Sequence, residues 1–251
     1  MGTKINSIRN KVVPDGVMLS TWLTSEGITR AEQSSYTKHN TLKRVSTGIY
    51  KFPDTELSLY GILTSYNEQG NFNYHLGAST ALEIRGFSHY ISMGKENVFI
   101  YTPIKYRLPE WIKVSQDNLN VIELSTQVLG EYGIERVEYE GYNLIISSPE
   151  RAIMECIILS PKYFNLMDIY YLMEMLNNLR SKLVQELLEN CTSVKVKRMF
   201  LYMARKAKHR WFEKIDVSKI NLGSGPRSFS TKGVKDSLFN IVIPKELADY
   251  E

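Results

Sequence analysis

The most constraining feature of this chain is the order of patterns in its first 52 residues, which predict three short helices followed by two short strands. Isoleucine and valine recur at helical spacing over residues 4–13, and Pro14-Asp15-Gly16 ends that helix. A second short helix is expected over residues 20–27, with Ser20 as its N-cap. Turn residues separate each pattern from the next, so this segment is expected to form a small module of its own.

The third helix is marked by a capping box. Thr29 and Glu32 provide the Thr-x-x-Glu pattern, in which each side chain satisfies a backbone amide of the other residue. The helix is expected to run to about Lys38, with Asn40 in the left-handed conformation just after it.

A hairpin follows the third helix. Residues 42–45 and 49–52 read as strands around the turn Ser46-Thr47-Gly48. Three helices and a two-stranded wing predict a winged helix-turn-helix domain over residues 1–55, in an N-terminal region that extends to about residue 90.

Charge is unevenly distributed along the chain. Residues 1–52 hold eight Lys or Arg and three acids, a net charge of +5, although the whole chain carries only +4. Residues 53–150 carry −7 and residues 151–251 carry +6. Basic ends around an acidic middle indicate two surfaces that suit phosphate.

The third helix and the hairpin carry the side chains best suited to duplex DNA. Arg and Gln make bidentate contacts with guanine and adenine edges, Ser and Thr make weaker ones, and basic wing residues suit phosphate. The alternative left open is a solvated basic face on a winged helix that binds protein. The candidate DNA-binding residues are Arg30, Gln33, Ser34, Thr37, Lys38, Lys43, Arg44 and Thr47, with Ala31, Ser35 and Tyr36 available to pack inward.

The rest of the chain mixes helical and strand patterns, so the predicted fold class is α+β: an N-terminal winged helix-turn-helix followed by a larger mixed α/β C-terminal domain over residues 91–251. Ser148 is expected to cap a helix that Pro149 opens, and helices dominate from there to about Trp211. The expected elements are helices at 57–65 and 78–85, strands at 98–101, 111–114, 120–123 and 142–146, and a terminal hairpin or small sheet at 229–230 and 239–243.

A second basic feature is the helical segment 193–208. Val196, Met199, Phe200, Met203 and Ala207 share one apolar face. A different face is expected to show a continuous basic stripe that meets nucleic acid or an acidic partner, because no acid occurs between Thr192 and Trp211. Replacing three of its cations by Glu should then leave the fold intact; the alternative is an ordinary solvated face. The stripe consists of Lys195, Arg198, Tyr202, Arg205 and Lys206.

The sequence shows no arrangement typical of catalysis. None of the four histidines, His39, His75, His89 and His209, pairs with another His or Cys at a metal-ligand spacing. Cys156 and Cys191 lie in apolar helical patterns, which predicts buried free thiols in a reducing compartment. The glycines at 223–226 lack the spacing of a phosphate loop. We therefore expect no enzyme activity, no metal and no cofactor.

Hydropathy points away from membranes. No stretch reaches the roughly 18–20 apolar residues that a membrane helix needs, and the first residues lack the apolar core of a secretory signal. A cytoplasmic protein without a membrane partner is expected.

Five short motifs, taken together and in this order, resemble the AbiEi family of type IV toxin–antitoxin antitoxins, first known from abortive phage-infection systems. The likeness covers nearly the whole chain, and its last block is the most specific part. The motifs are Trp-Leu-x-x-x-Gly-Ile (22–28), Gly-Ile-Tyr-Lys (48–51), HLGASTALEIRG (75–86), SSPERAIME (147–155) and LLENCTSVKVKRMFLY (187–202).

This resemblance implies a DNA-binding autorepressor with a second activity. The winged helix would bind inverted repeats in the double-stranded DNA of its own promoter. The C-terminal domain would oppose a nucleotidyltransferase-like toxin without forming a stable complex with it, and a basic surface on that domain would help to bind DNA. The third helix carries Gln33-Ser34-Ser35, which departs from the family pattern, so no operator sequence is carried over.

Two other function classes remain open. One is a stand-alone winged-helix transcription regulator that senses a ligand within residues 90–150 and has no toxin. The other is a nuclease or transferase subunit, which the absence of a carboxylate cluster disfavours because metal-dependent phosphoryl chemistry needs paired acids. A toxin-like reading frame beside this gene would favour the antitoxin.

Overall fold

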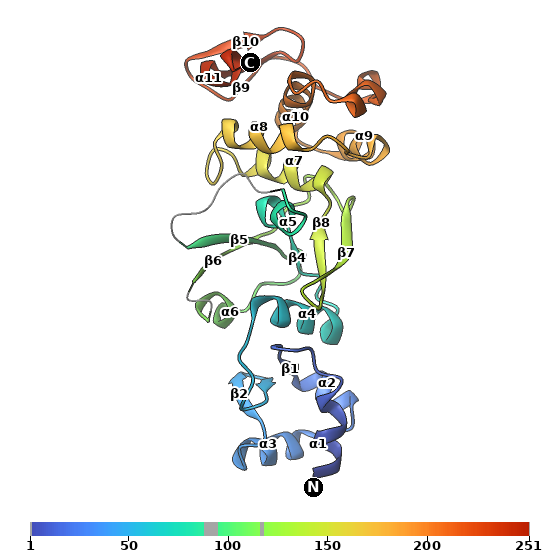
Figure 1. Cartoon of the computed structure of the whole chain (residues 1–251), viewed down its shortest axis with the longest axis vertical. Coiled ribbons are helices and arrows are strands. Elements are labelled where there is room, and N and C mark those ends of the chain that lie inside the picture. The colour runs from blue at the N-terminus through green and yellow to red at the C-terminus, as the bar shows by residue number, and fades with distance from the viewer. Residues whose placement is uncertain (1, 88–94, 116–117, 251) are drawn as a thin grey trace. The chain divides into compact units, whose positions relative to one another are not determined.

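The computed structural model describes residues 2–87, 95–115 and 118–250 of the chain (Figure 1). It mixes helices and sheets, which confirms the predicted α+β class. The chain divides into two compact units. The first contains residues 1–75, 100–125 and 136–145, and the second contains residues 76–99, 126–135 and 146–251.

The N-terminal part of the first unit has the element order helix, strand, helix, helix, strand, strand (Figure 1). Its three strands form an antiparallel sheet in the order β1-β3-β2, with Met18 opposite Tyr50 and Lys43 opposite Lys51. The first strand was missed because two residues are too few to show an alternating pattern. The elements are α1 (Gly2–Arg9), β1 (Met18–Leu19), α2 (Ser20–Ser25), α3 (Arg30–Lys38), β2 (Lys43–Ser46) and β3 (Ile49–Lys51).

One apolar cluster holds these elements together. Each of its side chains contributes about 1.5–3 kcal/mol when fully buried. The Arg9 guanidinium lies 4.4 Å from the centroid of the Phe52 ring and covers one edge of the cluster. Its buried members are Ile5, Ile8, Met18, Leu23, Ile28, Tyr36, Leu42 and Phe52.

The predicted caps of the module have different outcomes. Thr29 and Glu32 form the capping box at the start of α3, and Asn40 has a φ of 54°, so both predictions are confirmed. The prediction that Ser20 caps α2 is wrong: Ser20 is the first helical residue, and the N-cap position belongs to Leu19. The Ser20 hydroxyl is instead bonded to a side chain of α3.

The remaining helices of the first unit are α4 (Leu59–Gly70) and α6 (Glu110–Val114). Ser58 caps α4, and Asn71 ends it in the left-handed conformation with a φ of 52°. The strand predicted at 111–114 is wrong, because these residues form α6. A short apolar run has no periodicity that separates a strand from a buried helix turn.

A five-stranded sheet has the strand order β6-β5-β4-β8-β7. Its strand β4 runs parallel to β8, with Leu76 opposite Ile146. The strands predicted at 98–101, 120–123 and 142–146 are confirmed. The strands are β4 (His75–Leu76), β5 (Glu96–Tyr101), β6 (Leu119–Leu124), β7 (Ile134–Tyr139) and β8 (Tyr142–Ser147).

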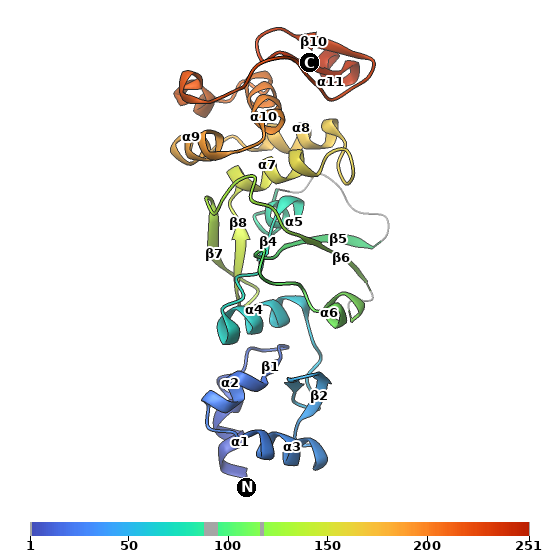
Figure 2. The same ribbon diagram turned by 180° about the vertical axis from the view of Figure 1, so that it is seen from behind.

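The second unit is built around α7 (Pro149–Leu159), which packs against α5 (Ala78–Ile84), α8 (Leu166–Met175), α9 (Ser181–Asn190) and α10 (Val194–Lys206) (Figure 2). Ser148 caps α7 and Pro149 stands in its first turn, as predicted. The short helices η1 (Arg210–Lys214) and η2 (Val217–Lys219) follow α10.

Two buried charges fix the centre of α7. Arg151 Nε lies 2.7 Å from Glu155 Oε1, and both side chains are almost fully buried. Arg151 also donates to the carbonyls of Gly130 and Tyr132, and Glu155 accepts a hydrogen bond from the amide of Ala78 at 2.9 Å. The start of α5 is therefore tied to α7.

This tie bears on where the chain could be divided. A cut at residue 91 would separate α5 from α7 and Leu76 from its partner Ile146. The division into functional domains at 1–55 and 91–251 stays a prediction, and we expect the shorter C-terminal fragment to lose part of its own core.

A small sheet closes the second unit. Its strand order is β10-β11-β9, with β10 antiparallel and β9 parallel to β11. The small sheet expected here is confirmed, and the strand predicted at 239–243 corresponds to β11. The strand predicted at 229–230 is wrong: β11 forms its hairpin with β10, and β9 ends just before residue 229. The elements are β9 (Arg227–Ser228), β10 (Gly233–Asp236), β11 (Ile241–Pro244) and α11 (Lys245–Asp249).

Candidate nucleic-acid interface

Helix α3 presents a polar face to solvent. Arg30, Ser34 and Lys38 are exposed and lie four residues apart, which places them on one side of the helix. Ala31 is also exposed, so the prediction that it packs inward is wrong, whereas Tyr36 is buried as predicted. The exposed face carries two cations and a hydroxyl.

Gln33 does not belong to that face. Its side chain is only 1% exposed. Its Oε1 accepts a hydrogen bond from Ser20 Oγ at 2.6 Å, and its Nε2 donates to the carbonyls of Ser20 at 3.2 Å and Ile28 at 3.0 Å. The interpretation of Gln33 as a base-reading side chain is therefore wrong: it joins α2 to α3.

Thr37 lies at the edge of the exposed face. It is half-buried, and its hydroxyl donates to the Gln33 carbonyl at 2.9 Å. A hydroxyl that bonds its own helix in this way is a weaker reader of bases than a hydroxyl that points to solvent.

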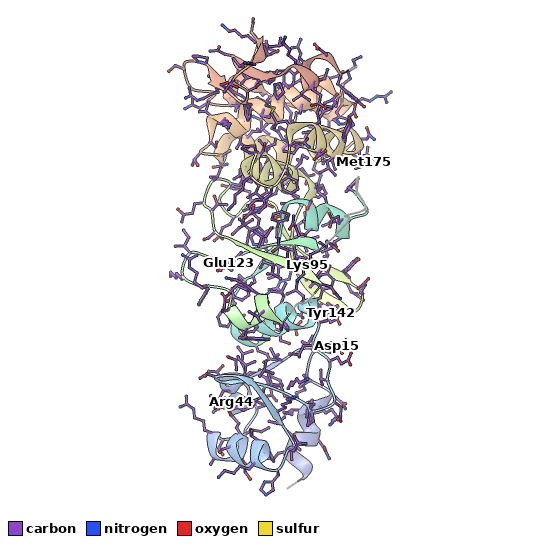
Figure 3. All side chains as sticks on the ribbon, turned by 90° about the vertical axis from the view of Figure 1, so that its left-hand side faces the viewer. Asp15, Arg44, Lys95, Glu123, Tyr142 and Met175 are labelled. Carbon is purple, nitrogen blue, oxygen red and sulfur yellow. The ribbon has the colours of Figure 1, made fainter. Side chains whose placement is uncertain are left out.

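The hairpin of β2 and β3 carries the other predicted residues. Lys43, Arg44 and Thr47 are all exposed, and Arg44 projects from the hairpin in Figure 3. Arg44 Nε donates to the Ser46 carbonyl at 3.2 Å, beside the bulge between Arg44 and Ser46. The turn is completed by Gly48, whose φ of 72° suits glycine.

The acids of residues 1–52 bind partners other than the cations of α3. Glu32 pairs with Lys4 at 2.8 Å and Glu26 pairs with Lys11 at 2.6 Å. Hydrogen bonds from Lys4 and from Thr29 lower the pKa of Glu32 to about 2. Asp15 accepts a hydrogen bond from the Tyr142 hydroxyl at 3.1 Å, and the two lie side by side in Figure 3.

Six of the eight cations in residues 1–52 form no ion pair with any residue that the structure describes. Two of these six have other contacts: the Arg9 guanidinium lies over the Phe52 ring, and Lys51 donates a hydrogen bond to the Thr55 carbonyl. The other four are Arg30, Lys38, Lys43 and Arg44. Their positive field is therefore not cancelled locally, which favours a negatively charged partner.

A depression of about 520 Å³ lies beside Arg30, one of these cations. Arg30 borders it from α3, Thr47 and Tyr50 border it from the hairpin, and Phe72, which follows α4, also lines it. Helix α3 and the hairpin therefore share one recessed surface.

The second predicted interface is contradicted at its centre. Arg198 is only 3% exposed, although it was expected on the basic stripe of α10. Its guanidinium donates to four backbone carbonyls, so the premise that it lies on an exposed stripe is wrong, and we expect its replacement by Glu to disturb the fold. The acceptors are Leu222 at 2.8 Å, Gly225 at 2.7 Å, Asn240 at 3.0 Å and Gly223 at 3.0 Å.

The other stripe residues fall into two groups. Lys195 and Arg205 are exposed, with the Lys195 ammonium 4.5 Å from the centroid of the Phe229 ring. Tyr202 and Lys206 are half-buried, and Lys206 donates to the carbonyls of Ala248 and Tyr250. The stripe is therefore not continuous, and only its two exposed cations remain candidates. The apolar face of α10 is confirmed, apart from the half-buried Ala207.

The cysteines and His209 have structural roles. Cys156 and Cys191 are buried free thiols, and burial raises the pKa of both. His209 contacts the Met173 carbonyl at 2.7 Å and stacks on Trp211, whereas His89 lies outside the described residues. Within residues 2–87, 95–115 and 118–250, no three His, Cys, Asp or Glu are grouped as metal ligands.

Among the described residues, no helix is long and apolar enough to cross a bilayer.

Sequence comparison places the chain in a class of regulators. The family described as "Transcriptional regulator, AbiEi antitoxin N-terminal domain" matches residues 1–93. The family described as "Transcriptional regulator, AbiEi antitoxin, Type IV TA system" matches residues 95–244. Both descriptions define a transcriptional regulator. The chain belongs to the AbiEi antitoxin family of type IV toxin–antitoxin systems, as its five motifs indicated.

A solved structure supports the fold. The crystal structure of the RV2827C protein from Mycobacterium tuberculosis aligns with 95% of this chain and 89% of that chain, with 15% sequence identity and a TM-score of 0.62. At this identity the likeness shows the fold alone. No curated protein matches the chain.

Proposed function

We propose that this antitoxin represses its own operon by binding inverted repeats in its promoter through the N-terminal module, which we interpret as a winged helix. The observation that supports this proposal is the set of unpaired cations on α3 and the β2–β3 hairpin. Helices and hairpins of this kind enter or flank the grooves of duplex DNA, and their cations bind its phosphates.

The exposed residues suit different parts of the duplex. Arg30 stands at the start of α3 and is the side chain best suited to a guanine edge, with Ser34 one turn further on as a weaker contact. Lys38, Lys43, Arg44 and Thr47 suit phosphate. Gln33 drops out of the proposed set because its hydrogen-bonding atoms are bonded inside the module.

Base contact and phosphate contact have different signatures in a binding experiment. Arg30→Ala should cost about 1–3 kcal/mol on the protein's own promoter and should relax sequence preference at one position. Lys43→Ala should weaken binding to all DNA similarly and should reduce the salt slope of log K by about one.

In the test, the protein is titrated into labelled promoter and scrambled duplexes at several salt concentrations, and fluorescence anisotropy reports the binding. Lys182→Ala, which removes an exposed cation from α9, is the matched control and should bind like the parent. Parent protein that binds promoter and scrambled DNA with equal affinity would overturn the proposal of promoter recognition.

The second half of the proposal concerns the toxin. We propose that the chain antagonises a nucleotidyltransferase-like toxin without forming a stable complex with it, in line with the family to which it belongs. Co-expression of this chain should restore growth to cells that express a nucleotidyltransferase-like toxin encoded beside its gene, and the two proteins should not co-elute in size-exclusion chromatography. Failure to restore growth would contradict antagonism, and co-elution would contradict the absence of a stable complex.

The exposed cations of α10 belong to this proposal as a secondary DNA surface. Lys195→Glu/Arg205→Glu should keep the fold, because neither side chain is buried, and should weaken DNA binding. Circular dichroism checks the fold. A folded variant that binds DNA like the parent would leave the N-terminal module as the DNA surface.

A ligand-sensing regulator has less support. The second unit contains a cavity of about 380 Å³. The charged groups that line it already satisfy one another: Glu135 bridges Arg85 and Arg180, and Glu150 also pairs with Arg180. A charged ligand would have to break these pairs.

A further inference from the structure

The loop between β5 and α6 is basic and exposed. Lys105, Tyr106 and Arg107 lie in sequence, and the side chains of all three reach solvent. It belongs to the same compact unit as the N-terminal module, although it lies some 50 residues beyond the hairpin in sequence.

Hydrogen bonds on both sides hold the loop in place. The Tyr106 amide donates to the Pro103 carbonyl at 2.8 Å, which closes a turn. The Tyr74 hydroxyl donates to the Arg107 carbonyl at 2.9 Å, and the Leu108 amide donates to Glu123 at 2.8 Å. The positions of the Lys105 and Arg107 backbones are therefore fixed by residues distant in sequence.

An aromatic contact places the loop beside the depression described above. The rings of Tyr106 and Phe72 have centroids 5.0 Å apart. Phe72 lines the depression together with Arg30 and Thr47. The loop thus adjoins the recessed surface that α3 and the hairpin share.

The charges of the loop have the same sign as those of the module. Neither Lys105 nor Arg107 forms an ion pair within the described part of the chain. The acid that holds the loop backbone, Glu123, forms its ion pair with Lys113 at 3.0 Å. The loop that adjoins this surface therefore carries two more cations that form no ion pair among the described residues, although the charge of Arg107 contributes to lowering the pKa of Glu123.

We propose that Lys105 and Arg107 bind the phosphate backbone of the same duplex that the N-terminal module grips. This proposal rests on the proposed function. A flexible Lys and a forked Arg side chain both bind phosphate oxygens without reading sequence. Contacts of this kind fix the orientation of the protein on the duplex, so the loop would set how far the protected site extends beyond the module.

Tyr106 acts in this scheme as a positioning residue. Its ring packs on Phe72 and holds the two cations on either side of it. Tyr106→Ala should loosen the loop and weaken binding, whereas Tyr106→Phe should bind like the parent because the ring contact is retained.

The experiment compares Lys105→Ala/Arg107→Ala with the parent on promoter and scrambled duplexes over a range of salt. Loss of two phosphate contacts should reduce the slope of log K against log salt by about 1.8 and should lower the affinity for both duplexes by roughly 30-fold at 0.15 M salt. The matched control, Lys182→Ala/Lys214→Ala, removes two exposed cations elsewhere and should change neither quantity.

The outcomes separate this inference from the proposed function. If Lys43→Ala weakens binding while the loop variant keeps the parent's slope and affinity, the loop proposal is overturned and the module stands. If the loop control weakens binding as much as the loop variant, the effect is one of net charge and the loop proposal is also overturned. If the parent binds no duplex at all, the proposed function fails first.

Discussion

The Ser20 hydroxyl and the Gln33 carboxamide form a hydrogen bond of 2.6 Å that joins the first residue of α2 to the centre of α3. The same carboxamide donates to the carbonyls of Ser20 and Ile28 and to the Thr24 hydroxyl, so one side chain contacts four polar groups at the junction of two helices. Gln33 is thus a structural residue that links α2 to α3.

We expect Gln33→Ala to lower the free energy of unfolding by about 1–3 kcal/mol, because it leaves buried polar groups of α2 and α3 without a partner. Urea denaturation followed by circular dichroism measures the change. Ser34→Ala, an exposed neighbour on the same helix, is the control and should stay within about 0.5 kcal/mol of the parent. A fully stable Gln33→Ala protein with altered base preference would instead restore Gln33 as a base-reading residue.

Arg198 is expected to stabilise the C-terminal sheet. Arg198→Met removes the donor from four carbonyls between residues 222 and 240 and should cost about 2–4 kcal/mol. Lys195→Met, on the exposed side of the same helix, should cost less than about 1 kcal/mol, since it loses only its contact with Phe229. Thermal unfolding compares the two. Equal stability of the variants would show that the buried guanidinium is dispensable.

The buried pair of Arg151 and Glu155 should be energetically coupled. Arg151→Met leaves a buried carboxylate without its cation and should cost about 3–5 kcal/mol. Arg151→Met/Glu155→Gln should cost less than the sum of its two single changes, because the second change removes the unpaired charge. A double-mutant cycle in urea gives the coupling energy, and strict additivity of the three variants would rule it out.

Glu150 should make stability depend on acid pH. Burial raises its pKa, but hydrogen bonds from the Arg180 side chain and amide outweigh burial and hold the pKa below its ordinary value of 4.5. Below about pH 4.5 the unfolded chain therefore takes up this proton before the folded one. The stabilisation is complete above that pH and is lost as the pH falls through the folded pKa.

Glu150→Gln should accordingly be less stable than the parent at pH 7, and its stability should fall less steeply between pH 5 and pH 3. Urea midpoints across that range provide the measurement, with the exposed Glu213→Gln as control. If the variant and the parent lose stability in parallel between pH 5 and pH 3, the Arg180 contact does not lower the pKa of Glu150 enough to matter.

Local signals in the sequence determined much of this molecule. The capping box of Thr29 and Glu32, the left-handed Asn40, the Ser148-Pro149 start of α7 and the apolar face of α10 were all predictable, because each depends on residues within one or two helical turns. The same short-range patterns, taken together, identified the family. The strand predicted at 111–114 was wrong for the complementary reason: four residues contain too little periodicity to distinguish a helix from a strand.

Only the tertiary structure decided which polar side chains are available to a partner. Gln33 and Arg198 occupy positions that helical spacing assigns to solvent, yet both are buried by segments that pack over them from elsewhere in the chain. Conversely, Lys105 and Arg107 belong to no recognisable sequence motif. They became candidates because Tyr106 packs on Phe72, which lines the same depression as Arg30. Periodicity fixes the direction of a side chain relative to its own helix axis, whereas burial depends on contacts between residues distant in sequence, which no local pattern encodes.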